Sequence, residues 1–118
     1  MSKPHLKLDV WKRAIRFVEQ IYKITTSFPS EEKFGLTSQM RRAAVSIPSN
    51  IAEGAARNSS KEFINFLHIA QGSLSELETQ LIISKNLQFL DSQTEETLQR
   101  ELDEISKMII GLQRALRK

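Results

Sequence analysis

The sequence predicts an all-α protein, an antiparallel up-down-up-down bundle of four helices in a single domain. Glycine and proline are scarce, at 4 and 3 in 118 residues, so the intervals between breaks are too long for strands. Apolar residues recur at steps of three and four in four segments, as in helices that bury one face. Short connections make consecutive helices antiparallel neighbours. The alternative is a pair of helical hairpins that completes its core only in an oligomer.

The first helix is expected over residues 9–27. Asp9 is the expected N-cap, and the helix should end where Phe28 precedes Pro29. Its apolar stripe consists of Val10, Ala14, Phe17, Ile21 and Ile24.

The second helix is expected over residues 36–56. Pro48 lies inside it, lacks an amide donor and crowds the carbonyl of Ala44, which predicts a kink rather than an end. The inward residues are expected to be Leu36, Met40, Ala43, Ile47 and Ile51.

The third helix is expected over residues 60–86 and the fourth over 94–116. Ser59 and Glu62 have the spacing of a capping box at the start of the third. Gly72-Ser73 in its middle is costly for a helix, which predicts a close approach there by another helix, near Ala43, Ala44 or Pro48. The two apolar stripes are Phe63, Leu67, Ala70, Leu74, Leu77 and Leu81, and Leu98, Leu102, Ile105, Ile109, Leu112 and Leu116.

Positive charge is concentrated in the first half of the chain. The net charge is +3, but residues 1–61 hold 11 Lys and Arg against 5 Asp and Glu. On a helical wheel several of these cations share the face opposite the apolar stripe of the first helix. Clustered cations bind nucleic acid by displacing its counterions, although a solvated helix face has the same pattern. The candidate nucleic-acid-binding residues are Lys12, Arg13, Arg16, Lys23, Arg41, Arg42, Arg57 and Lys61. No platform rich in aromatic residues is evident, which predicts weak sequence preference and strong salt dependence.

Some apolar stripes are too wide for one core. A wide stripe needs a second burial surface, which predicts self-association unless the helix is covered by the chain's own loops. The candidate interface residues are Trp11, Phe63, Phe66 and Ile69.

Polar residues at inward-leaning positions predict a buried network rather than a catalytic or metal site. We expect Arg41 or Arg42 to meet acidic side chains of neighbouring helices and to fix their register. The residues of this network are Arg41, Arg42, Asn50, Glu53, Glu76 and Glu78. No catalytic residue, metal site or cofactor is expected, because cysteine is absent, the two histidines have no ligand spacing, and no phosphate-binding loop occurs.

No apolar run is long enough for a signal peptide or a membrane span, so we expect a mature chain in the cytoplasm, with no membrane partner.

Two motifs carry a resemblance to a known family. The block GLTSQMRRAAVSIPSNIAEGAAR at 35–57, followed by AQGSLSELETQL at 70–81, resembles the bacterial four-helix-bundle proteins known as 23S ribosomal RNA intervening-sequence proteins. The stretches LDVWKRA and FPSEEKFGL fit as well. The matching positions are Arg41, Arg42, Asn50, Glu53 and Gly54, and then Gly72, Ser73, Glu76 and Glu78.

The resemblance implies a homopentamer, and kinship with the Avd accessory protein of diversity-generating retroelements, which binds nucleic acid and works with a reverse transcriptase. It supplies no catalytic residues. We therefore expect a non-enzymatic oligomer that binds RNA more readily than DNA, with a reverse transcriptase as a partner by analogy. The alternative is a protein-interaction scaffold without a nucleic-acid role.

Overall fold

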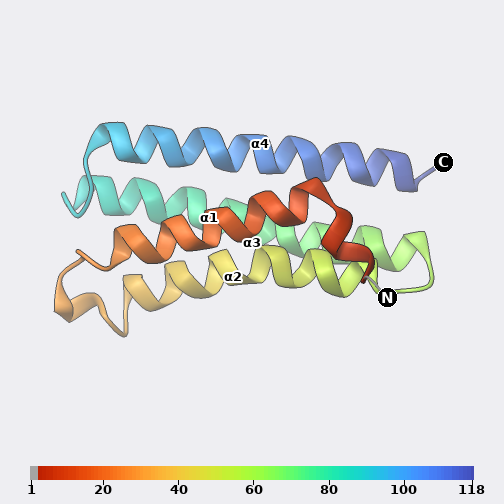
Figure 1. The fold of residues 1–118 in the computed structure, drawn as a ribbon. Helices are drawn as coiled ribbons and strands as arrows, with labels where there is room; N and C mark the ends of the chain where they lie inside the picture. The colour runs from red at the N-terminus through yellow and green to blue at the C-terminus, as the bar shows by residue number, and fades with distance from the viewer. Residues whose placement is uncertain (1–2) are drawn as a thin grey trace.

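A computed structural model describes residues 3–118 as four α-helices that alternate in direction (Figure 1). The helices are α1 (Asp9–Thr25), α2 (Leu36–Ala55), α3 (Ser60–Asn86) and α4 (Ser92–Leu116). Two short 3-10 turns, η1 (Pro4–Lys7) and η2 (Ser30–Glu32), precede α1 and α2. The predicted all-α bundle and its four helices are confirmed, with boundaries shifted by no more than two residues.

The helix starts follow from local hydrogen bonds. The hydroxyl of Ser59 accepts the amide of Glu62 at 3.1 Å, as the capping pattern predicts. The carboxylate of Asp91 accepts the amide of Thr94 at 2.7 Å, so α4 begins two residues earlier than predicted. The prediction of Asp9 as an N-cap is wrong, because Asp9 is already helical and Leu8 occupies the cap without a side-chain bond.

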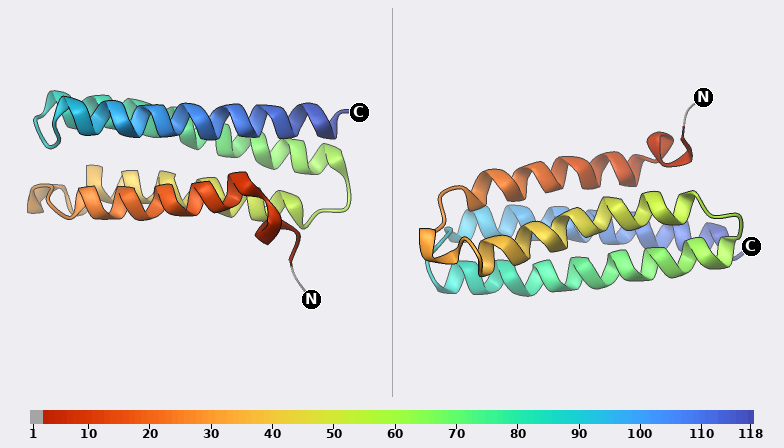
Figure 2. Two further views of the ribbon diagram at one scale, coloured as in Figure 1. Left: turned by 45° about the horizontal axis from the view of Figure 1, so that its top comes forward. Right: turned by 90° about the horizontal axis from the view of Figure 1, so that it is seen from below.

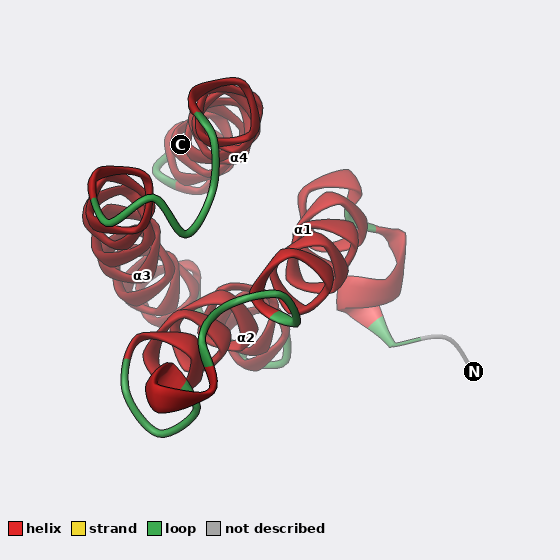
Figure 3. Ribbon diagram, turned by 90° about the vertical axis from the view of Figure 1, so that its left-hand side faces the viewer, coloured by secondary structure: helices red, strands yellow, loops and turns green. Residues whose placement is uncertain are grey.

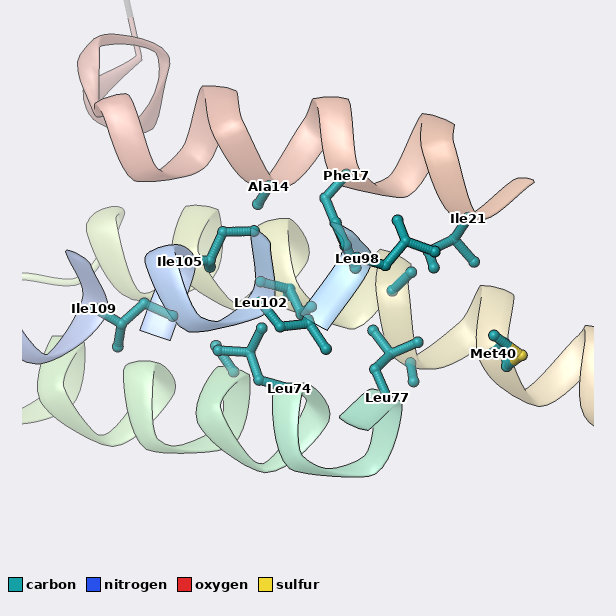
Figure 4. Packing of buried hydrophobic residues seen from close by; sticks show 14 of the residues in the cluster. Ala14, Phe17, Ile21, Met40, Leu74, Leu77, Leu98, Leu102, Ile105 and Ile109 are labelled. Carbon is teal, nitrogen blue, oxygen red and sulfur yellow. The ribbon is translucent and has the colours of Figure 1, made fainter. Parts of the chain in front are cut away.

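The core runs the length of the bundle and is built from the predicted stripes. Phe17 and Ile21 of α1 point toward Leu98 and Leu102 of α4 and Leu77 of α3 (Figure 4). The fully buried large apolar side chains are Phe17, Ile21, Met40, Ile47, Ile51, Leu67, Leu77, Leu81, Ile105 and Ile109. Burying such a side chain contributes about 1.5–3 kcal/mol, so this core holds the helices together.

The central element is α2, which packs against α1 on one side and more extensively against α3 on the other (Figure 3). Its core face is rich in small residues, including Ala43, Ala44 and Gly54. The helix continues through Pro48, as predicted. Among neighbouring pairs, α1 and α4 have the least extensive contact.

The packing of α2 against α3 is tight at Gly54. A Cβ atom there would come within 2.8 Å of both Phe63 and Phe66. Of the two residues predicted for a close approach, Gly72 takes no part, because it is exposed and a Cβ there would meet nothing within 4 Å. Its neighbour Ser73 makes the interhelical contact instead, with its hydroxyl 2.8 Å from that of Ser46.

The bundle is elongated, with principal dimensions of 44 × 24 × 20 Å. The α1–α2 and α3–α4 connections lie at one end, and the α2–α3 connection lies at the other with the C-terminus (Figure 2). Within residues 3–118, no helix combines the length and apolar character that crossing a bilayer requires.

The close contact at Gly54 predicts a large asymmetry between two Gly→Ala substitutions. Gly54→Ala should lower the free energy of unfolding by about 1–3 kcal/mol, because its methyl group overlaps two phenylalanines. Gly111→Ala, on α4 with nothing within 4 Å of the new Cβ, should raise it by about 0.5–1 kcal/mol. Urea unfolding followed by circular dichroism measures both, and equal effects would contradict the packing described.

Candidate nucleic-acid interface

Of the four cationic candidates on α1, three are exposed and one forms an ion pair with α4. Lys12, Arg16 and Lys23 are exposed on the outward face, but Glu19 lies among them. A shallow pocket of about 470 Å³ combines cations with two carboxylates, and its lining is Arg13, Arg16, Glu19, Gln20, Lys23 and Glu101. The acidic side chains reduce the positive potential of this face.

Arg13 bridges α1 to α4, although 35% of its side-chain surface remains exposed. Its Nε and Nη2 atoms donate to the two carboxylate oxygens of Glu101 at 2.7 and 3.1 Å. The hydrogen bonds from Arg13 to Glu101 and the charge of Glu101 raise the pKa of Arg13. In the single chain a carboxylate therefore already holds the guanidinium of Arg13, and the part of Arg13 in nucleic-acid binding stays a prediction.

Arg41 points toward α1 and is held in place there. Its Nε donates to the hydroxyl of Thr25 at 2.9 Å and its Nη2 donates to the carbonyl of Tyr22 at 3.3 Å. Its Cζ atom lies 4.6 Å from the centroid of the Tyr22 ring. Because a guanidinium has five N–H donors, several remain for another acceptor.

Arg42 points away from α1, because successive helical residues are about 100° apart. It is exposed, and no side chain within residues 3–118 makes a hydrogen bond or ion pair with it. With Arg41 and Lys33 it lines a pocket of about 580 Å³ between α1 and α2. Lys33 could not be identified from the sequence, because this residue lies in the connection before α2 and a helical wheel cannot group it with other cations.

The remaining two candidates lie at the other end of the bundle. Arg57 pairs with Glu53 at 3.2 Å, and its Cζ atom lies 4.9 Å from the centroid of the Phe66 ring. Lys61 is exposed at the start of α3. The eight candidate cations therefore do not form one continuous face, since the α2–α3 connection is opposite the α1–α2 connection (Figure 1).

The predicted ionic network does not form in the single chain. Arg41 faces α1, while Glu53 bonds along its own helix to Arg57 and Glu76 accepts from Gln80 at 3.3 Å. The side chain of Glu78 is exposed. Its backbone carbonyl accepts a hydrogen bond from the side-chain amide of Gln99 on α4 at 3.0 Å. The three carboxylates are exposed, and Glu76, which lines the α2–α3 groove together with Arg42, makes no ion pair with it.

Hydroxyl and amide groups occupy the α2–α3 seam in place of ion pairs. Asn50 donates to the carbonyl and the hydroxyl of Ser46 at 2.8 and 2.9 Å, and Ser73 of α3 lies 2.8 Å from the same hydroxyl. A polar groove of about 390 Å³ follows this seam, lined by Gln39, Arg42, Ala43, Ser46, Ser73 and Glu76.

Three of the four residues predicted for an oligomer interface are used within the chain. Trp11 and Phe63 pack against the core, and Phe66 lies between Gly54 and Arg57. Trp11 also meets His5 edge to face, with ring centroids 5.0 Å apart. Only Ile69 stays largely exposed, at 51% of its surface.

The described residues contain no group of three or more His, Asp or Glu side chains that could hold a metal ion. The Nδ1 atom of His68 lies 3.4 Å from the Nε2 atom of Gln113, across the α3–α4 seam.

The fold and these cations define a class of protein: a small helical bundle with positive charge at the end where α1 meets α2. The family described as 23S rRNA-intervening sequence protein matches residues 6–111. The chain belongs to this family, which confirms the resemblance seen in the two sequence motifs. A crystal structure of a protein of unknown function from the S23 ribosomal protein family of Bacteroides thetaiotaomicron is similar, with a TM-score of 0.79 and 26% sequence identity. The similarity covers 88% of this chain and 97% of that one. No functionally curated protein matches.

The contact between Arg41 and Thr25 predicts a measurable coupling between α2 and α1. Arg41→Met and Thr25→Val should each lower the free energy of unfolding by about 1 kcal/mol, because each removes one partner of a largely buried hydrogen bond. The double variant should lose less than the sum, with a coupling of about 0.5–1.5 kcal/mol. Thr79→Val removes an exposed hydroxyl on α3 and is the control. Urea unfolding of the three single variants and the double variant measures this, and full additivity of Arg41→Met with Thr25→Val would contradict the contact.

Proposed function

We propose that the protein is a non-enzymatic RNA-binding bundle that holds phosphate groups where α1 meets α2. The observation that carries the proposal is the cluster of Lys33, Arg41 and Arg42 around one pocket whose lining contains no Asp or Glu. Two other candidate cations pair with carboxylates, Arg13 with Glu101 and Arg57 with Glu53. A phosphate can therefore gain the full attraction of these three cations without displacing an acidic side chain.

The family supports RNA as the anionic partner, because its description refers to an intervening sequence in 23S rRNA. Exposed Lys23, Arg16 and Lys12 extend positive charge from this end along α1. A backbone that crosses the cluster could continue along these side chains. Phosphate contacts of this kind carry little sequence information, so we expect weak sequence preference.

We further propose that the protein acts as a homo-oligomer, the pentamer that the family resemblance implies. Apolar side chains stay exposed on α3, where Ile69, Ile82 and Ile83 keep 51%, 46% and 41% of their surfaces accessible. Ile69 and Ile83 fall on the same side of the helix, and such patches are typical of subunit contacts. Association would also multiply the charge of +3 per chain on one particle.

Charge reversal at the cluster tests the RNA proposal. Arg42→Glu and Lys33→Glu should each weaken binding of a labelled structured RNA by about tenfold or more, because each replaces an attraction by a repulsion. Raising salt from about 50 to about 200 mM should weaken wild-type binding by at least about tenfold, as expected for three phosphate contacts. Lys107→Glu makes the same charge change on exposed α4 and should have little effect. Fluorescence anisotropy measures these affinities, and equal losses in all three variants would refute the assignment of the site.

Light scattering tests the oligomer. The mass at micromolar concentration should be a multiple of 13.5 kDa, and five times that value for a pentamer. Replacing Ile69 and Ile83 together by Lys should reduce the mass, whereas Ile110→Lys on α4 should not. A wild-type mass of one chain would contradict self-association.

A further inference from the structure

The cationic pocket between α1 and α2 is also lined by two aromatic rings, those of Tyr22 and Phe34. Among the described residues, these are the aromatic side chains among the exposed large apolar groups. At about 580 Å³ it is within the range of about 300–1,000 Å³ that is usual for ligand sites. Its lining is Tyr22, Lys33, Phe34, Thr37, Ser38, Arg41, Arg42, Val45 and Ser46. Three hydroxyl side chains, two aromatic rings and three cations thus surround one hollow that has no carboxylate in its lining.

Phe34 has no structural reason to be aromatic. It keeps 89% of its surface exposed, the most of any large apolar side chain in the described chain, so its ring contributes almost nothing to the core. The Nζ atom of Lys33 lies 5.5 Å from the centroid of this ring. An exposed ring beside a cation offers a π-face and a positive charge to the same ligand.

Tyr22 provides a second ring on the opposite wall, from the last turns of α1. It is 42% exposed, and the guanidinium of Arg41 lies against it, anchored by the hydroxyl of Thr25. Unlike a mobile surface arginine, Arg41 is therefore already positioned before any ligand arrives. Each of the two rings thus has a cation beside it, Arg41 at Tyr22 and Lys33 at Phe34.

We propose that this pocket binds an unpaired nucleotide, with the base stacked on the exposed rings and the phosphate held by the three cations. The inference rests on the proposed RNA-binding function and specifies its substrate as single-stranded or looped RNA. Bases in a duplex are stacked on one another and cannot offer their faces to a side chain, whereas unpaired bases stack readily on aromatic rings. No aromatic platform is evident in the sequence, because Tyr22 and Phe34 are 12 positions apart and come to line one pocket only in the fold.

Phe34→Ala provides the test, since so exposed a ring can be removed without unfolding the chain. Anisotropy titrations compare an unstructured 12-nucleotide RNA with a fully paired RNA duplex of equal phosphate number, both at low salt. Phe34→Ala should weaken single-strand binding by about 5- to 100-fold, the range for loss of one base–aromatic stack, and change duplex binding by less than about twofold. Phe34→Trp should retain the affinity. Leu87→Ala removes an exposed apolar side chain from the α3–α4 connection and should change neither.

The outcomes separate this inference from the function on which it rests. If wild-type protein binds neither RNA, both fail. If it binds both RNAs and Phe34→Ala leaves single-strand affinity unchanged, or weakens both equally, only the pocket assignment fails. Two further results would also overturn it. One is tighter, Phe34-dependent binding of an acidic peptide that competes with the RNA. The other is a loss of oligomer mass in Phe34→Ala, which would make Phe34 a contact between copies.

Discussion

The arrangement of the bundle depends on how closely α2 can approach its two neighbours. Small residues on its core face, Ala43, Ala44 and Gly54, let α3 and α1 pack on either side. At Gly54 there is no room for even one methyl group against Phe63 and Phe66. Because interiors are packed at the density of organic crystals, such a contact fixes the rotation of α2 about its axis. That rotation in turn determines where each outward side chain of α2 can reach.

The consecutive arginines of α2 illustrate this consequence. Arg41 turns to α1, where Thr25 and the Tyr22 ring hold it, and Arg42 turns outward at the mouth of the α2–α3 groove. The connection before α2 then brings Lys33 and Phe34 to the same pocket. Cations from one helix and one connection are thus gathered beside two aromatic rings, in a pocket whose lining contains no carboxylate.

Much of the fold could be predicted from the sequence because it is specified locally. The apolar stripes and the cap at Ser59 give helix positions within two residues, since periodicity and capping act over a few neighbouring positions. The interface could be predicted only in part. The sequence identifies Arg41 and Arg42 as candidate cations, but it cannot tell which of them points outward. Nor can it tell that Glu101 of α4 takes Arg13, or that Tyr22 takes Arg41. These partners lie far apart in the chain, and only packing brings them together.

The central claim is that RNA contacts the end of the bundle where α1 meets α2. Photo-crosslinking of full-length protein to single-stranded RNA carrying 4-thiouridine, followed by mass spectrometry of the linked peptides, tests it most directly. The account predicts crosslinks concentrated in residues 22–46, at Tyr22 and Phe34 above all, that disappear when unlabelled RNA is added in excess. Crosslinks confined to the α2–α3 connection around Arg57 and Lys61, or to the outer face of α4, would contradict it.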